Sequence, residues 1–269
     1  MTGWRRLRAN GPMIVLFTYM LLFLAFIIVP IAAVVVVSFS ASSYIVFPMH
    51  GMSLRWYRHI FAYRPFMDAL VTSIELALSS ALLGALLGVP AALALARARS
   101  GAGLIANFML APLGVPAIVL GFALLYFLSS FSLGLGFAPL LIAHTVVAVP
   151  YIVRTVLATY RAVSPNLEES ASILGASRVQ VLWHLTLPMV RPGIFAGAMF
   201  AVLTSMDNLP LSFFFGTADT NTLPVVMLSY MENQFDPSIA AISVVQMLIA
   251  VLALLVLDRI YGVERLTAA

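Results

Sequence analysis

Runs of apolar residues long enough to cross a lipid bilayer occupy most of this chain and constrain its fold more than any other feature. An α-helix needs about 20 such residues to span a hydrocarbon core roughly 30 Å thick. One stretch, 100–153, contains no Arg, Lys, Asp or Glu and is too long for a single crossing. Of all 269 residues, 62% are hydrophobic and only 9% are charged, whereas a soluble domain has roughly 25% charged residues. We therefore expect an all-α integral membrane protein.

The uncharged runs predict six transmembrane helices in a single domain over 1–269. A Ser- and Gly-rich turn at 129–136 divides the long middle stretch into two spans. Two loops are longer than a connection requires, at 39–68 and at 160–192. The predicted spans are 13–38, 69–96, 104–129, 137–159, 193–215 and 237–258.

The positions of the arginines indicate the orientation in the membrane. All 14 basic residues are arginine, and an even number of spans places both termini on one side. Only Arg55, Arg58 and Arg64 lie on the opposite side, while the others concentrate on the side of the termini. Because basic residues gather in cytoplasmic loops, we expect both termini in the cytoplasm. The positive net charge therefore reflects membrane topology and not nucleic-acid binding.

Missing residue types exclude several kinds of chemistry. The chain has no lysine, so it has no phosphate-binding P-loop and no Schiff-base lysine. It has no cysteine, and hence no disulfide, thiol nucleophile or thiolate metal site. The motifs HExxH and GxSxG are also absent. We expect a chain that is not an enzyme and that holds no metal or cofactor of its own.

The loop at 160–192 contains the most informative motif. Its residues 164–177 predict a short helix, with Glu168 and Glu169 near the positive end of the helix dipole and Gly175 at the C-terminal end. The apolar residues of this helix share one face, which is typical of a helix that docks into a partner's groove. An amphipathic helix lying on lipid headgroups is the alternative. A second apolar run follows, and we expect it to stop at Pro188 before Pro192 restarts the fifth span.

This loop resembles the EAA loop of bacterial ABC-importer permeases. The family pattern is E-A-A-x3-G-x9-I-x-L-P, and this chain has Glu169-Ser170-Ala171, Gly175 and Leu185-Thr186-Leu187-Pro188 at the same spacing. The resemblance covers essentially the full chain and is closest to the second permease of spermidine/putrescine-type importers. It implies the fold of a type I importer permease, with a cytoplasmic coupling helix between the fourth and fifth spans. The ATPase-coupling residues that it implies are Glu168, Glu169, Ser170, Ala171, Gly175, Ala176 and Ser177.

The same resemblance implies a set of partners in a bacterial inner membrane. It implies a dimer of cytoplasmic subunits that bind ATP and Mg²⁺ and supply the free energy of transport. It also implies a second permease chain, homologous but not identical, and a periplasmic or external solute-binding protein. No nucleic acid is expected.

Polar and aromatic groups within the spans are candidates for the solute path, because ionisable side chains in a bilayer usually face the bundle interior. Asp207 lies near the middle of the fifth span, beside Asn208 and ahead of Pro210, which interrupts the helix. Its carboxylate can pair with a cationic solute or be satisfied within the protein. Glu75 can contact solute or pair with Arg154 in the fourth span. The aromatic candidates, which can contact a cation or simply pack, are Tyr126, Tyr151 and Phe214.

Two further features of the spans bear on structure. Pro112, Gly114, Pro116 and Gly121 disfavour a regular third span and predict a kink or gate. His144 has no second histidine or carboxylate at metal-ligand spacing, which favours a hydrogen-bonded structural role.

These observations favour a permease subunit of an ATP-driven importer, with a polyamine or related organic cation as solute. Polyamine permeases of the resembled kind tend to have two acidic residues where this chain has Asp207 and Asn208, so another solute remains open: an amino acid derivative, a phosphonate or a metal complex. An ion-coupled secondary transporter is a further alternative, but it would leave the EAA-like loop without a role.

Overall fold

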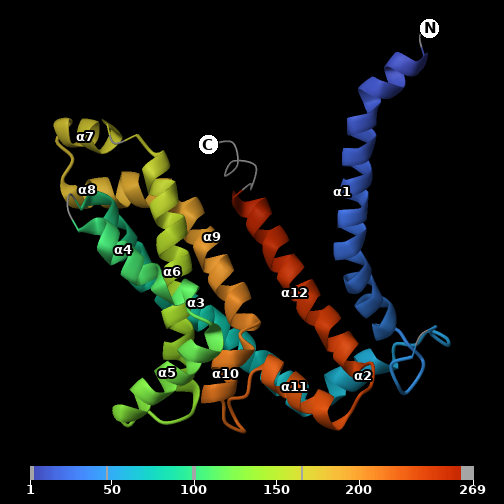
Figure 1. Cartoon of the computed structure of the whole chain (residues 1–269). Coiled ribbons are helices and arrows are strands. Elements are labelled where there is room, and N and C mark those ends of the chain that lie inside the picture. The colour runs from blue at the N-terminus through green and yellow to red at the C-terminus, as the bar shows by residue number, and fades with distance from the viewer. Residues whose placement is uncertain (1–2, 47, 99–100, 165, 262–269) are drawn as a thin grey trace. The chain divides into compact units, whose positions relative to one another are not determined.

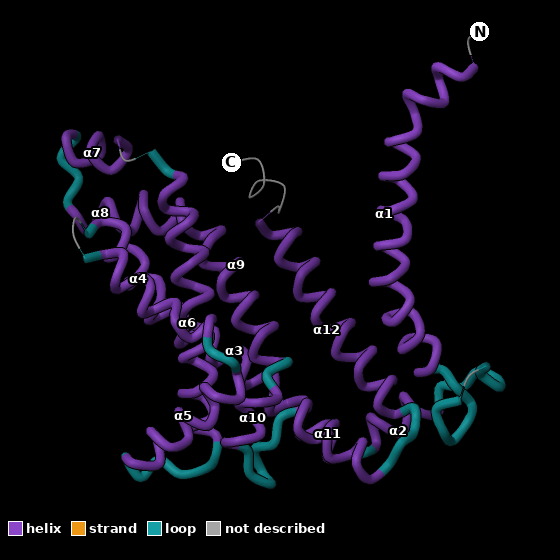
Figure 2. The backbone as a smooth tube through the Cα atoms, in the orientation of Figure 1, coloured by secondary structure: helices purple, strands orange, loops and turns teal. Residues whose placement is uncertain are grey.

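The computed structural model describes residues 3–46, 48–98, 101–164 and 166–261. Within these residues every regular element is a helix, apart from one isolated antiparallel bridge between Ser40 and Met52 (Figures 1 and 2). The elements are α1 (Gly3–Ser38), α2 (Arg55–Ala62), α3 (Arg64–Arg97), α4 (Ala102–Leu110), the 3-10 turn η1 (Ala111–Gly114), α5 (Ala117–Ser130), α6 (Phe137–Ala162), α7 (Asn166–Ile173), α8 (Arg178–Val181), the π-helical turn η2 (Leu182–Thr186), α9 (Leu187–Met206), α10 (Leu209–Phe215), α11 (Leu223–Asn233) and α12 (Ser238–Tyr261).

The all-helical, multi-span fold class expected from the sequence is confirmed. Among the described residues, five helices are long and apolar enough to cross a membrane, and the pair formed by Ala102–Gly114 and Ala117–Ser130 makes a sixth candidate that bends by 108°. The five are Met13–Ser38, Arg64–Arg97, Phe137–Ala162, Arg178–Met206 and Ser238–Val256.

The chain forms two compact units. The first lies within Met1–Tyr63 and Tyr230–Leu248, and the second within Arg64–Ser229 and Ile249–Ala269. In the first unit, the Trp56 indole N–H donates to the Ser40 carbonyl over 2.9 Å, and the Tyr57 hydroxyl lies 2.7 Å from that of Ser38. These bonds hold α2 against the C-terminal end of α1. The candidate sites lie in the second unit.

The fifth span differs from its predicted course. The helix begins at Arg178, inside the expected loop, and continues through α8, η2 and α9 to Met206. Pro188 and Pro192 therefore do not stop and restart it, and the segment expected up to 215 is a separate helix, α10. Pro188 lies just after the π turn and Pro192 lies inside α9, and the packing of α9 outweighs the backbone hydrogen bonds that these prolines cannot make.

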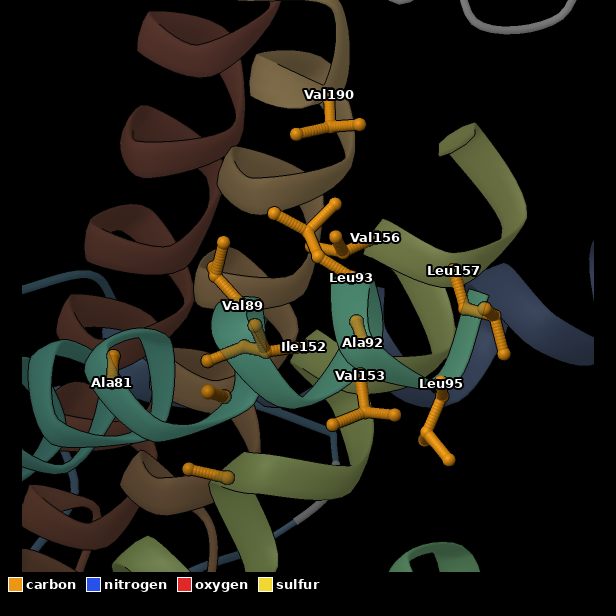
Figure 3. Close-up of a cluster of buried hydrophobic side chains, with 12 residues drawn as sticks. Ala81, Val89, Ala92, Leu93, Leu95, Ile152, Val153, Val156, Leu157 and Val190 are labelled. Atoms are coloured by element: carbon orange, nitrogen blue, oxygen red, sulfur yellow. The ribbon is translucent and has the colours of Figure 1, made fainter. Parts of the chain in front are cut away.

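The core of the second unit is the packing of α3, α6 and α9. Figure 3 shows buried side chains of α3 (Val89, Ala92 and Leu93) among those of α6 and α9. All of these are apolar residues without a polar atom to satisfy, so close packing stabilises the cluster. The α6 members are Ala148, Ile152, Val153, Val156 and Leu157, and the labelled α9 member is Val190.

Glycines bring the three backbones close together. Gly84 and Gly88 form a G-x-x-x-G pair on α3, and a Cβ atom at Gly84 would lie 2.9 Å from the Cβ of Ala148 on α6. Gly193 and Gly197 form a second such pair on α9, and a Cβ at Gly197 would lie 2.7 Å from the Cα of Ile152. Helix α6 is therefore held between two glycine faces, which is a usual way for membrane helices to associate.

Candidate functional site

The interruption between α9 and α10 exposes the acidic residue expected on the solute path. Helix α9 ends at Met206, and Asp207 follows it as an exposed C-cap. Asn208 is the N-cap of α10, because its side-chain oxygen accepts the Leu211 amide at 3.2 Å. Pro210 lies in the first turn of α10, where its missing N–H costs nothing. The amide oxygen of Asn208 thus caps a helix, whereas the Asp207 carboxylate is left exposed.

His144 ties the two sides of this interruption together. Its ring is buried, with Nδ1 2.8 Å from the Ser205 hydroxyl of α9 and Nε2 3.3 Å from the Ser212 hydroxyl of α10. Both ring nitrogens therefore have partners, in agreement with the hydrogen-bonded structural role expected for this residue. Through these bonds α6 fixes the geometry of the segment that contains Asp207.

A second interruption, between α4 and α5, faces the same place. The chain turns by 108° after η1, where Val115 is extended with ψ of 133° before Pro116, the conformation that a following proline favours. This is the kink predicted from the prolines and glycines of the third span. Helix α5 then begins at Ala117.

The two interruptions meet at an open pocket of about 420 Å³. The polar residues among those that line it are Asp207, Asn208 and Thr204. The C-terminal end of α9, which has a partial negative charge, adds to the negative potential of Asp207. The lining residues are Ala117, Leu203, Thr204, Asp207, Asn208 and Pro210.

Of the candidates for the solute path, the structure brings only Asp207 and Asn208 together at this pocket. Tyr126 is exposed on α5, Tyr151 stacks on Phe200 with ring centroids 6.2 Å apart, and Phe214 packs edge-on against Phe122. Thr204 and Ala117 were missed because a lone threonine and a helix start carry no distinctive sequence signal.

The pairing considered for Glu75 and Arg154 does not occur. Both side chains are exposed, and Arg97 and Glu168 form an ion pair instead. The two residues lie on different helices, α3 and α6, whose facing surfaces are filled by apolar residues and glycine, so both charges point outward. Nor do the described residues contain a group of three His, Asp or Glu side chains placed to hold a metal ion.

The EAA-like segment forms two short helices. Helix α7 ends in a Schellman motif: Gly175 has φ of +87°, and the amides of Ala176 and Gly175 donate to the carbonyls of Ala171 and Ser172. Ser177 then caps α8 in a reciprocal capping box with Gln180. Pro165, the residue before α7, lies outside the described residues. The small residues of the motif thus define where one helix ends and the next begins.

Glu168 is the side chain that attaches α7 to the rest of the second unit. Its Oε1 accepts hydrogen bonds from Arg97 at 2.9 Å and from Thr186 at 2.6 Å. Arg97 also donates to the Tyr160 hydroxyl at 3.3 Å. Burial by itself raises the pKa of the Glu168 carboxyl, but the hydrogen bonds from Thr186 and Arg97 and the charge of Arg97 outweigh it and hold the pKa below its usual range.

Interrupted helices in an apolar bundle are tolerated where they line a cavity, and they commonly form the solute site of transporters. The fold and the pocket therefore define a multi-pass membrane transport protein. Residues 84–263 match the family described as binding-protein-dependent transport system inner membrane component, and the chain belongs to this family. It is accordingly a permease subunit of an ABC importer in the inner membrane, and not an enzyme.

Relatives and solved structures agree with this assignment. The chain is 28% identical over 243 residues to the spermidine/putrescine transport system permease protein PotC of Haemophilus influenzae, covering 90% of this chain and 94% of that protein. It is 29% identical over 232 residues to the putrescine transport system permease protein PotI of Escherichia coli, covering 83% and 82%. It is 33% identical over 205 residues to the molybdenum transport system permease protein ModB of Mycobacterium tuberculosis, covering 70% and 76%.

Two solved transporters share the fold. A chain of a bacterial ABC transporter that imports the acidic polysaccharide alginate matches with a TM-score of 0.71 at 16% identity, covering 96% of this chain and 98% of that chain. A chain of the methionine ABC transporter MetNI, in an inward-facing conformation, matches with a TM-score of 0.61 at 20% identity, covering 74% and 97%.

Proposed function

We propose that this permease passes an organic cation of the polyamine type through the pocket at Asp207. The observation that carries the proposal is the position of this carboxylate, exposed at the point where two interrupted helices meet. A carboxylate and the negative end of α9 attract an ammonium group. Relatives named for spermidine and putrescine transport cover most of the chain, which supports the same solute class.

We also propose the partners and orientation that the importer requires. Both termini and α7 lie in the cytoplasm, as the arginine distribution favours. There α7 docks on a dimer of subunits that bind ATP and Mg²⁺, with Glu169, Ser170 and Ala171 among the contacting residues. A homologous but different permease chain completes the path, and a periplasmic binding protein delivers the solute. The exposed Glu75, Arg154 and Tyr126 are available to that second chain or to the solute.

The test is uptake by the assembled importer in proteoliposomes, with spermidine and its solute-binding protein on the outside. Asp207→Asn should raise the half-saturating concentration about tenfold, the equivalent of roughly 1.4 kcal/mol, because the amide keeps the shape and removes the charge. Asp219→Asn is the matched control, since Asp219 is exposed and lies outside the pocket. Wild-type uptake of spermidine by Asp207→Asn would show that the carboxylate does not contact the cation.

An anionic solute is the second candidate. The relative named for molybdenum transport has the higher identity, and the N-terminal end of α5 at Ala117, which has a partial positive charge, also lines the pocket. A thermal shift of the solute-binding protein separates the two, because a bound ligand stabilises it by mass action. Stabilisation by spermidine and not by molybdate would support the cation, and the reverse would assign Asp207 to structure.

A further inference from the structure

Helix α7 is attached to the rest of the second unit through one of its two adjacent glutamates. Among its described side chains, Glu168 alone forms a hydrogen bond outside the helix, and none of the residues of α7 is buried. Glu169 is exposed. Because successive residues on an α-helix point about 100° apart, the two carboxylates face different surroundings.

Glu168 bonds directly to Arg97 and Thr186, and Arg97 in turn bonds to Tyr160, so three separate helical segments are joined. Arg97 is the last residue of α3, Tyr160 belongs to the last turns of α6, and Thr186 is the last residue of the π turn η2. We name these three residues and Glu168 the α7 clamp. Thr186 is 2% exposed, and Arg97 also donates to its hydroxyl at 3.3 Å. One carboxylate thus connects α7 to the ends of the helices that form the core.

The π turn contributes directly to this arrangement. A π turn widens a helix by one residue and often marks a functional site. Here the extra residue rotates the residues before the turn by about 100° relative to a regular α-helix. Thr186 is the last residue of the turn, and its hydroxyl lies between Glu168 and the Val181 carbonyl, which is 3.3 Å away.

We propose that Glu168 is a positioning residue, which couples α7 to the transmembrane helices through Arg97 and Thr186 and does not itself contact the ATPase. Glu169 on the neighbouring face is left for that contact. This inference rests on the proposed docking role of α7. The inference assigns a coupling role to two further residues, Arg97 and Thr186, which are not part of the EAA pattern.

The core explains how the clamp conveys movement. Helices α3, α6 and α9 pack through buried side chains and through the glycine pairs of α3 and α9, so their ends move together. A displacement of α7 by a partner acts through Glu168 on all three. Without the clamp, no described side chain of α7 forms a hydrogen bond to these helices.

Two measurements test the clamp on the complete importer in lipid nanodiscs or proteoliposomes. The first is amide hydrogen exchange in α7, which reports the attachment whether or not transport occurs. Arg97→Gln and Glu168→Gln should each speed exchange in α7 about tenfold, and Glu232→Gln, a control at an exposed glutamate of α11 outside the clamp, should not. The second is the number of ATP molecules hydrolysed per solute transported, which should rise about fivefold or more in the clamp variants.

Two further variants guard against a trivial loss of folding. Arg97→Lys keeps the charge and should couple better than Arg97→Gln, and the exchanged pair Arg97→Glu with Glu168→Arg should recover both slow exchange and coupling. In all clamp variants the ATPase should remain bound, whereas Glu169→Gln should weaken its co-purification.

The inference is overturned if α7 exchanges as in the wild type, if it loosens while the ATP-to-solute ratio stays unchanged, or if Glu168→Gln releases the ATPase as Glu169→Gln does. Failure of the proposed function itself is a different result: the wild-type complex would show no ATP-dependent uptake, although α7 would still loosen in the clamp variants.

Discussion

Replacing Gly197 by alanine tests the packing of α9 on α6. The added Cβ would lie 2.7 Å from the Ile152 Cα and would also overlap the Thr155 hydroxyl. Ordinary contacts between carbon atoms are about 3.5–4.0 Å. The obstacle is backbone, which cannot rotate away as a side-chain end can, so the two helices must separate by about 1 Å.

The expected cost follows from two opposing effects. Overpacking of this kind costs about 1–3 kcal/mol, while alanine favours a helix over glycine by up to about 1 kcal/mol. Gly103→Ala on α4 is the matched control, because nothing lies within 4 Å of its added Cβ and only the second effect applies. The free energies of unfolding of the two variants should therefore differ by about 1–3 kcal/mol.

Thermal unfolding of the purified permease, followed by tryptophan fluorescence, measures this difference. For a chain of this size, about 1 kcal/mol shifts Tm by roughly 2–4 °C, so Gly197→Ala should unfold about 2–12 °C below Gly103→Ala. Equal Tm values for the two variants would refute the close approach of α6 and α9. If both Tm values fell equally below that of the wild type, glycine flexibility, and not contact, would be what the two positions require.

Three further outcomes follow from the same structure. His144→Ala should lower the free energy of unfolding by about 2–4 kcal/mol, because Ser205 and Ser212 lose their buried partner; the same Tm assay measures it, and a change below about 1 kcal/mol would argue against the bridge. The low pKa of Glu168 stabilises α7 attachment above the ordinary glutamate value of about 4.3, and this contribution disappears as the pH falls through the lower folded-state value. Hydrogen exchange in α7 should then be flat between neutral pH and about 5 after correction for intrinsic rates and rise in acid, whereas Glu168→Gln should show no such step. Gly175→Ala forces a side chain into φ of +87° and should cost the end of α7 about 1–2 kcal/mol, seen as faster exchange of its last turn.

Local sequence signals predicted the features that depend on local physics. Hydropathy predicted the multi-span helical class, because each span needs its own apolar length, but it did not give the course of the fifth span. Proline and glycine indicated the break before α5, and Pro210 the one before α10, since both act on the backbone of their own neighbours. Gly175 was expected at the end of a helix, and it is the left-handed residue of a Schellman motif.

Features that depend on which helix faces touch were not predicted. Arg97 and Glu168 are separated by 71 residues, and neither has a neighbour in sequence that indicates the other. Opposite charge suggested Glu75 with Arg154 instead, but charge alone does not tell which side of a helix faces another. The two G-x-x-x-G pairs are a known signal of close packing, but only the structure shows that both pairs face α6.

One continuous helical segment, which includes the π turn η2, connects the coupling segment with the pocket. From Arg178 to Met206 it has 29 residues, which corresponds to a length of about 43 Å. Thr186 of the clamp lies near its start, and Asp207 follows its last residue. Gly193 and Gly197 fix its middle against α6, and His144 of the same α6 holds Ser205 at its far end. A displacement applied at Thr186 can therefore reach Asp207 without passing through a loop, which is the physical basis for proposing that the clamp and the pocket act together.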